Sequence, residues 1–564
     1  MSHSNKLKLA ILLLILGMAI FMRFAGLRII PPGLYPDEAM NGNNALEVLK
    51  SGLPWYSGFK VFYPENNGRE GLFINIQALM LKVLGNEPWA LRVVSAIFGT
   101  LTVLALYFLA KELFAQKQEE KSIEPGEKQN NASDFLNHTS NLLPLLTTFF
   151  LATSYWHITF SRIGFRAISA PFFLTLAVWG LVRGLRTGSI PALIVGGLSF
   201  GLGFNTYISY RLTPLIIAIP IIIALKEWWK NKGNTERKCA PCAILLFLFF
   251  AFIAVLPLGL YYIKHPADFM GRAGQVSIFN TTSPIQAFFL STAKTLGMFN
   301  IVGDCNWRHN YACWPELWPP VGLLFLLGIG ISLRTFWKKN FIAKRSALLL
   351  LVWLVVTLLP AMLSGEGVPH ALRTLLAVIP AAAFAAIGLK GVMNYTQDWL
   401  KLALANPKYN IYQGQLLRIG RELFILLIVF LVAIPVFTLK AYSQWGINPN
   451  TFDAFAGRYV LIGQYLNKLP QNLPKFVIVN ELGVMVRGIP MPAQTIMFIT
   501  DTFLPEDREK KNIHYLLPNE LPQLGGINKG IIIPLETNSQ MEAQLHDIFP
   551  GKTLRKDFLG ALRI

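Results

Sequence analysis

Blocks of about 20 apolar residues recur along the chain, and they constrain its fold more than any other feature. Clear examples are Leu7–Phe24, Leu142–Phe160, Ile190–Thr206, Ala243–Tyr262 and Ile425–Leu439. A helix needs roughly 20 apolar residues to cross a hydrocarbon core about 30 Å thick. Backbone polar groups cannot stay unpaired in lipid, so each block is predicted to be a transmembrane helix. Only 15% of the 564 residues are charged, which is too few for a water-soluble protein of this length.

The placement of charge supports this interpretation. The net charge of +20 is concentrated in short links between apolar blocks, as the positive-inside rule describes, and does not indicate a nucleic-acid-binding face. Counting from a cytosolic N-terminus gives about eleven spans, with outer loops at residues 28–88 and about 264–318. The polar segment 115–141 is expected to be a mobile cytosolic loop. Three basic clusters then lie inside, at 226–238, 334–345 and 401–421.

The composition changes after residue 442. Residues 443–564 contain no spanning block, and an odd number of spans places them outside. Helical periodicity at 459–469 and near 539–548 alternates with short β-type runs at 476–479, 495–500 and 530–534. Strands that alternate with helices indicate a small α/β domain. The expected fold is therefore an all-α polytopic membrane domain, residues 1–442, followed by an extracytoplasmic α/β domain, residues 443–564.

The first outer loop carries two acidic motifs. Pro36 is followed by Asp37 and Glu38, and Glu65-Asn-Asn-Gly-Arg-Glu70 comes shortly before the second span. Proline followed by two acids is a typical helix start, because the helix dipole favours negative charge there. A capping role and a chemical role are compatible. A carboxylate at a helix N-terminus has its charged form stabilised, so it stays ready to accept a proton or bind a metal.

These motifs carry a resemblance to a known family. The chain resembles the C-class glycosyltransferases of the dolichyl-phosphate-mannose protein mannosyltransferase type, family 39, and their bacterial relatives. The matching segments are Asp37-Glu38, Glu65–Glu70, Ser161-Arg-Ile-Gly-Phe-Arg166 and His370-Ala-Leu-Arg-Thr-Leu-Leu-Ala-Val-Ile-Pro380. Two departures put a protein acceptor in doubt. The loop 264–318 is too short for the family's large soluble domain, and the second motif lacks the usual His-Pro-Pro-Leu.

The resemblance implies inverting transfer of a sugar from a polyprenyl-phosphate donor to an acceptor hydroxyl at the outer face of the cell membrane. Such a reaction needs one general base and cations near the leaving phosphate. Asp37 is the expected base, with Glu38 as an orienting or metal-binding partner. The expected substrate-binding residues are Glu65, Asn67, Arg69, Glu70, Arg162, Arg166, Arg211, His370 and Arg373. For each arginine the alternative is an interfacial snorkelling residue, and for Glu65 and Glu70 it is a solvated loop acid.

The resemblance leaves partners and cofactors partly open. The acceptor is a lipid, a glycan or a protein, membrane lipids surround the chain, and no nucleic acid is expected. A divalent cation, Mg²⁺ or Mn²⁺, is left open, with no ligand set identified.

The four cysteines fall into two pairs. Cys305 and Cys313 lie in the second outer loop, where an oxidising compartment favours a disulfide over the alternative of two thiols. Cys239 and Cys242 have no nearby Cys or His to complete a zinc site, so they are interpreted as two small apolar residues at a helix entry.

Two other functional classes compete with the enzyme. A transporter would place ionisable residues near mid-membrane, often in repeated halves, whereas the charged motifs here gather at one face and no repeat is visible. A non-catalytic envelope assembly protein would bind a partner through its outer tail and would tolerate loss of Asp37.

Overall fold

The structure is a computed structural model that describes residues 3–51, 54–114, 142–230, 239–337, 341–406, 412–527, 529–550, 555–556 and 561–563. The expected cytosolic loop 115–141 lies outside these residues.

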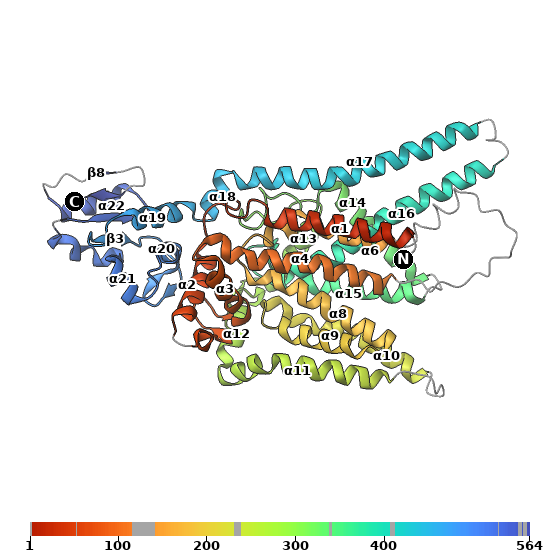
Figure 1. The fold of residues 1–564 in the computed structure, drawn as a ribbon, viewed down its shortest axis with the longest axis horizontal. Coiled ribbons are helices and arrows are strands. Elements are labelled where there is room, and N and C mark those ends of the chain that lie inside the picture. The colour runs from red at the N-terminus through yellow and green to blue at the C-terminus, as the bar shows by residue number, and fades with distance from the viewer. Residues whose placement is uncertain are drawn as a thin grey trace.

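The first part of the chain is a helical bundle (Figure 1). Within the described residues, nine helices are long and apolar enough to cross a membrane. They are α1 (His3–Phe24), α4 (Pro88–Leu113), α8 (Ser169–Thr187), α10 (Pro214–Lys230), α11 (Ala240–Lys264), α14 (Pro319–Arg334), α15 (Phe341–Met362), α16 (Val378–Ala405) and α17 (Gln413–Gly446). Two shorter apolar helices, α6 (Leu143–Ala152) and α9 (Ile190–Gly203), take the places of the third and fifth predicted spans. The predicted count of eleven is reached only when these two are included.

The third predicted span is interrupted. Helix α6 stops at Ala152 and a short helix, α7 (Tyr155–Phe160), continues after the break. The side chain of Ser154 caps α7 by accepting a hydrogen bond from the His157 backbone N–H, which explains why the helix restarts there.

Two predicted boundaries are wrong. The tenth span does not open at His370, because residues 370–377 form turns and the 3₁₀ helix η7 (Leu375–Ala377) before α16 begins. The eleventh span is predicted to follow a cytosolic stretch that ends at Glu422, whereas α17 already begins at Gln413. Its residues favour helix, and Arg418 pairs with Glu422 one turn away. Figure 1 shows α16 and α17 reaching past the other helices at the end away from the C-terminal domain.

The cysteines at the start of α11 are also corrected. Cys239 is the N-cap residue and its sulfur accepts a hydrogen bond from the Cys242 backbone N–H. This spacing brings the two side chains together over the first turn, and the structure bonds the sulfurs at 2.14 Å. The interpretation as two unpaired apolar residues is therefore wrong. Cys305 and Cys313 are bonded as well, with an S–S distance of 2.05 Å.

The outer loops are folded. The first contains α2 (Pro36–Lys50), η1 (Trp55–Gly58), an antiparallel pair β1 (Phe62–Tyr63) and β2 (Arg69–Glu70), and α3 (Gly71–Leu84). The second contains α12 (Pro266–Gln275), η5 (Ile278–Asn280) and α13 (Pro284–Gly297). The remaining short turns of the bundle are η3 (Arg166–Ile168), η4 (Ile208–Leu212) and η6 (Thr335–Trp337).

The C-terminal part is an α/β domain, as expected. A five-stranded sheet has the order β6-β3-β7-β9-β8, with β3 parallel to both β6 and β7. Its strands are β3 (Lys475–Ile478), β6 (Ile513–Leu516), β7 (Ile531–Pro534), β8 (Arg555–Lys556) and β9 (Leu562–Arg563), and a separate hairpin pairs β4 (Met485–Val486) with β5 (Ile489–Pro490). Its helices are α18 (Pro449–Ala454), α19 (Gly457–Lys468), α20 (Gln494–Thr500), α21 (Pro505–Lys511) and α22 (Ser539–Ile548), with the 3₁₀ helices η9 (Met491–Ala493) and η10 (Pro518–Gly526).

One predicted strand of this domain is wrong. Residues 495–500 form most of α20, which packs between α2 and α19. Six of the seven α20 residues are buried. A short apolar run that is buried on all sides has no helical or strand periodicity, so sequence alone could not separate the two.

The C-terminal domain docks on the first outer loop through α20. The Asn43 side chain donates to the Gln494 carbonyl at 3.1 Å, and the Thr495 hydroxyl donates to the Leu34 carbonyl at 2.9 Å. Phe498 is fully buried against Gly42 of α2, where an added Cβ would overlap its ring. Helix α17 continues to Gly446, past residue 442, so the connection between the two parts is helical.

Gly42→Val is expected to disturb this docking. The new side chain must displace the Phe498 ring, and overpacking of this kind costs about 1–3 kcal/mol. We expect a lower thermal transition temperature and faster proteolytic release of the C-terminal domain. Gly330→Val in α14, where no atom lies within 4 Å of the added Cβ, is the matched control. Equal behaviour of the two variants would contradict the docking.

Candidate active site

Asp37 stands at the start of α2, in the loop on which the C-terminal domain docks. Tyr35 is the N-cap and Pro36 occupies the first helical position, so Asp37 lies in the first turn, where the helix dipole favours its charge. The side-chain amide of Asn66 donates to Asp37 Oδ1 at 2.9 Å. Asn66 has a φ of +52°, in the turn between β1 and β2, and this left-handed conformation points its amide at the helix start. Asp37 is only partly buried, so a substrate can reach its carboxylate.

Glu38, the next residue, has a different environment. Its side chain is fully buried and forms an ion pair with Arg92 of α4, with Nε–Oε2 and Nη2–Oε1 distances of 3.0 and 3.1 Å. The Gly164 backbone N–H donates to Oε2 at 2.6 Å. Arg92 also donates to the carbonyls of Pro31 and Gly33. Both Glu38 oxygens are thus engaged in holding α2 against α4 and the 161–166 link, an orienting arrangement that leaves no oxygen open for a metal.

Arg69 of β2 reaches under α2. It is 2% exposed and donates to Asn41 Oδ1 at 2.6 Å and to the Asn44 side-chain oxygen. Burial lowers the pKa of the Arg69 guanidinium to about 10, and the nearby positive charge of Arg166 contributes to the shift. The group therefore stays charged at neutral pH.

Glu70 gathers two further arginines. Arg166 of η3 lies 2.8 Å from Glu70 Oε2, and Arg211 of η4 lies 3.8 Å from Oε1. The Tyr262 hydroxyl, at the end of α11, donates to Glu70 Oε1 at 3.5 Å and accepts a hydrogen bond from Arg211 Nη2 at 3.1 Å. We call Asp37, Arg69, Glu70, Arg166 and Arg211 the acid–arginine cluster. Three positive and two negative charges leave this cluster with one net positive charge, which favours a phosphate.

Five other residues expected at the site lie in different surroundings. Arg162 is buried and donates to the Tyr442 hydroxyl and to the carbonyls of Met22 and Ile30, each at 3.0 Å, so it joins α1 to α17. Arg373 bonds to Ser364 and to the Glu366 carbonyl within its own loop.

Glu65 and Asn67 occupy the turn between β1 and β2. Arg487 of the C-terminal domain pairs with Glu65 at 2.9 Å. Burial alone would raise the pKa of the Glu65 carboxyl, but the hydrogen bond and charge of Arg487 outweigh it and lower that pKa. Asn67 is exposed, with a φ of +62°.

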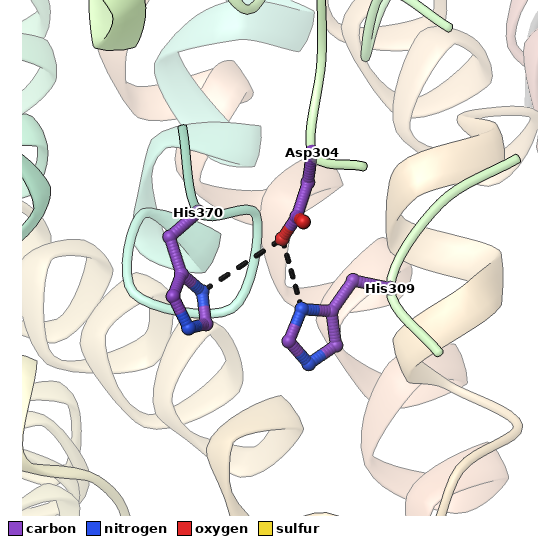
Figure 2. Close-up of side chains that lie close together, drawn as sticks. All are labelled: Asp304, His309 and His370. Atoms are coloured by element: carbon purple, nitrogen blue, oxygen red, sulfur yellow. Dashed lines mark hydrogen bonds and ion pairs between the residues drawn. The ribbon is translucent and has the colours of Figure 1, made fainter. Parts of the chain in front are cut away.

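His370 lies in a separate group. Figure 2 shows it beside Asp304 and His309, with its Nδ1 atom 3.8 Å from Asp304 Oδ2.

Sequence reasoning missed several residues that build the site. Asp37, Asn41 and Asn44 are spaced by four and three positions, which places them on one face of a helix, and this signal was present in the sequence. A charged residue inside an apolar block is a signal too, and it would have singled out Arg92. The supporting role of Asn66 depends on the hairpin turn, which the sequence did not reveal.

A cavity of about 360 Å³ lies between the loop 303–318 and the helices α6, α14, α16 and α17. Its walls are mainly apolar and include Trp156, Trp314, Trp318 and Phe437. Glu316 also lines the cavity. One of its oxygens accepts the Asp304 backbone N–H at 3.0 Å, and burial raises the pKa of the Glu316 carboxyl well above its ordinary value. The mainly apolar lining suits an apolar group.

Comparison with known proteins places this geometry in context. The sequence model of the dolichyl-phosphate-mannose-protein mannosyltransferase family matches residues 72–119. No curated protein sequence matches the chain at a significant level. Among solved structures, ArnT from Cupriavidus metallidurans bound to undecaprenyl phosphate has a TM-score of 0.58 and 12% identity, covering 100% of this chain and 98% of that one. The apo form of the same protein has a TM-score of 0.55 at 12% identity and the same coverage.

The archaeal oligosaccharyltransferase of Archaeoglobus fulgidus, tethered to an acceptor peptide, has a TM-score of 0.44 and 11% identity, over 91% of this chain and 64% of that one. The whole-length likeness to ArnT shows the fold of a multi-pass membrane protein. The matched segment and this fold together confirm the resemblance expected from the sequence, to the C-class membrane glycosyltransferases of the dolichyl-phosphate-mannose protein mannosyltransferase type.

Proposed function

We propose that the chain is an inverting glycosyltransferase that moves a sugar from a polyprenyl-phosphate donor to an acceptor hydroxyl. The observation that carries the proposal is the acid–arginine cluster, in which a reachable carboxylate at a helix N-terminus lies in one group with three arginines. Support comes from the whole-length likeness to a structure of ArnT that contains undecaprenyl phosphate.

Each charged group has one task in this reaction. Asp37 accepts the proton of the acceptor hydroxyl while the hydroxyl oxygen attacks the anomeric carbon from the face opposite the phosphate. The new C–O bond forms as the bond to the phosphate oxygen breaks, and that oxygen leaves with the electron pair. Arg69, Arg166 and Arg211 stabilise the charge that develops on it. Glu70 fixes Arg166 and Arg211, and Asn66 fixes Asp37, so little reorganisation is needed during the step.

We assign the apolar cavity to the prenyl chain of the donor. The loop 303–318 forms one wall of the cavity, and it also contacts the start of α2, because the Arg308 guanidinium stacks 4.0 Å from the Tyr35 ring. A chain in the cavity would therefore end near the acid–arginine cluster.

Ala382→Trp tests this assignment. Ala382 lines the cavity from α16 and is 6% exposed, so an indole would fill space assigned to the chain. Each buried methylene is worth about 0.8 kcal/mol, so losing room for two of them should raise the donor KM at least about tenfold. Leu426→Trp on α17, 61% exposed on the outside of the bundle, is the control. An unchanged KM in the folded Ala382 variant would place the chain elsewhere.

We place the acid–arginine cluster on the extracytoplasmic side. The ends of α10 and α16 that lead into basic sequence lie at the opposite end of the bundle from the C-terminal domain, and positive charge favours the cytosolic side. The membrane concerned is the cell membrane, where nucleotide sugars are not expected outside.

The decisive experiment is a donor screen. Purified protein in sealed vesicles of each orientation is incubated with a panel of polyprenyl-phosphate sugars, and released polyprenyl phosphate is measured. We expect release from at least one donor, only when that donor and the acceptor face the acid–arginine cluster. Sugar movement across the vesicle membrane without bond cleavage would instead identify a transporter. If no donor releases polyprenyl phosphate, the proposal that the chain is a glycosyltransferase is overturned.

A further inference from the structure

Asp304, His309 and His370 converge in a group that the proposed reaction does not use (Figure 2). Asp304 and His309 belong to the loop between α13 and α14, and His370 belongs to the turn before η7. His309 Nδ1 lies 2.8 Å from Asp304 Oδ2, and His370 Nδ1 lies 3.8 Å from the same oxygen. Their ligand atoms all lie within 4.8 Å of one another. Asp304 and His309 are about 95% buried, so these polar groups meet away from bulk water.

The spacing of the three atoms suits a tetrahedral metal ion. Zn–N and Zn–O bonds are about 2.0–2.2 Å long, so two ligands at a tetrahedral angle lie about 3.3 Å apart. The observed separations of 2.8 and 3.8 Å lie on either side of that value. All three ligand atoms lie within 4.8 Å of one another, so side-chain movements would have to bring them to a common centre around the ion.

The groups around Asp304 and His309 already hold them in place. The Asn306 backbone N–H donates to Asp304 Oδ1 at 2.8 Å, and the Ala371 backbone N–H donates to Oδ2 at 2.9 Å. The His309 ring packs 5.4 Å from the Phe160 ring and 6.4 Å from the Phe165 ring. Outer contacts of this kind orient metal ligands in proteins.

A disulfide bond also constrains the loop that carries Asp304 and His309. The disulfide between Cys305 and Cys313 encloses His309 and begins one residue after Asp304. The loop is therefore constrained before any ion arrives, which lowers the entropy cost of binding.

We propose that Asp304 Oδ2, His309 Nδ1 and His370 Nδ1 bind one Zn²⁺ ion, with water in the fourth position. Two imidazoles and one carboxylate are a ligand set that Zn²⁺ takes, whereas Mg²⁺ prefers oxygen ligands alone. Each imidazole binds in its neutral form and carries its remaining proton on Nε2.

The ion would fasten two outer loops to each other. One of them carries Arg308, which stacks on Tyr35 directly before the α2 start, and the other leads into α16. The site is therefore assigned to holding the outer face together, and its existence does not depend on the proposed transfer reaction.

Metal content and affinity test the proposal directly. The full chain is purified without chelator, its metals are measured by mass spectrometry, and Zn²⁺ affinity is measured by competition with a chromophoric chelator. We expect about one zinc per chain, no displacement by millimolar Mg²⁺, and a thermal transition that a strong chelator lowers. His370→Asn should weaken Zn²⁺ binding at least about tenfold, because one of three protein ligands is lost. His546→Asn, at an exposed histidine of α22, should bind like the wild type.

A second variant keeps the test informative if Asp304 or His309 variants fail to fold. His370 is partly exposed, so His370→Cys should fold and should still bind metal, with a Co²⁺ absorption spectrum that gains thiolate charge-transfer bands. A wild-type chain that binds no stoichiometric Zn²⁺ after incubation with the ion would overturn the proposal. So would equal Zn²⁺ affinity of the wild type and His370→Asn. Since no outcome is read from sugar transfer, failure here is distinct from failure of the proposed function.

Discussion

Asp37→Asn is expected to reduce turnover by about 10²–10⁴-fold, the usual cost of losing a general base. The amide keeps the shape of the side chain but cannot accept the acceptor proton. Donor binding should persist, because the three arginines proposed to stabilise the phosphate are unchanged. Released polyprenyl phosphate under single-turnover conditions measures the first effect, and donor affinity measures the second.

A helix-capping role for Asp37 predicts the opposite result. Asparagine caps helices about as well as aspartate, so a purely structural Asp37 would tolerate the change. Asp453→Asn, at an exposed residue of α18, controls for the loss of one negative charge on the same side. Near wild-type transfer by folded Asp37→Asn would remove Asp37 from the mechanism and direct attention to Glu70.

Glu38→Ala should mainly lower the folding stability of the protein and affect the reaction only as a consequence. The substitution leaves Arg92 buried without its carboxylate, and breaking a buried ion pair costs about 3–5 kcal/mol. A chain of ordinary stability would lose a large part of its folding free energy, so we expect poor yield and a much lower thermal transition. The measurement is thermal or chemical unfolding in detergent, compared with the Asp37→Asn protein.

The double variant separates lost pairing from lost shape. Glu38→Ala with Arg92→Met removes both charges, so part of the stability should return, and a double-mutant cycle measures how much. If Glu38→Ala unfolds at the wild-type temperature, the ion pair does not hold α2 in place. Asp37 and Glu38 would then contribute more similarly to stability than their burial indicates, since Asp37 is partly exposed and Glu38 is fully buried.

The fold was predictable where the determining information is local. A run of about 20 apolar residues specifies a span by itself, and the bounds of α22 were anticipated closely from periodicity. Residues 495–500 were mistaken for a strand because α20 is helical only in the company of α2 and α19. The late start of α16 also has a distant cause, because the turn at His370 and Ala371 bonds to Asp304, 67 residues from Ala371.

The site shows the same division. Acidic residues beside a proline and arginines near span ends are visible in the sequence, so Asp37, Arg69, Glu70, Arg166 and Arg211 could be nominated. The partners of buried charged residues could not be nominated. The contact of Glu38 with Arg92 spans 54 residues of sequence, and that of Arg162 with Tyr442 spans 280. The sequence shows Arg162 as a candidate substrate ligand, but it does not show the hydrogen bonds of Arg162 to protein groups.

Helix α17 offers a practical route to imaging the molecule. Its 34 residues extend over about 51 Å, compared with a hydrocarbon core of about 30 Å. One end leads directly into the C-terminal domain, and the other reaches past the bundle beside α16 (Figure 1). A rigid protein fused between these two helices, in continuous helical register, would project at a fixed angle from the end of the bundle away from the C-terminal domain. Such a marker would give small particles in electron micrographs a recognisable orientation, at the face opposite the acid–arginine cluster.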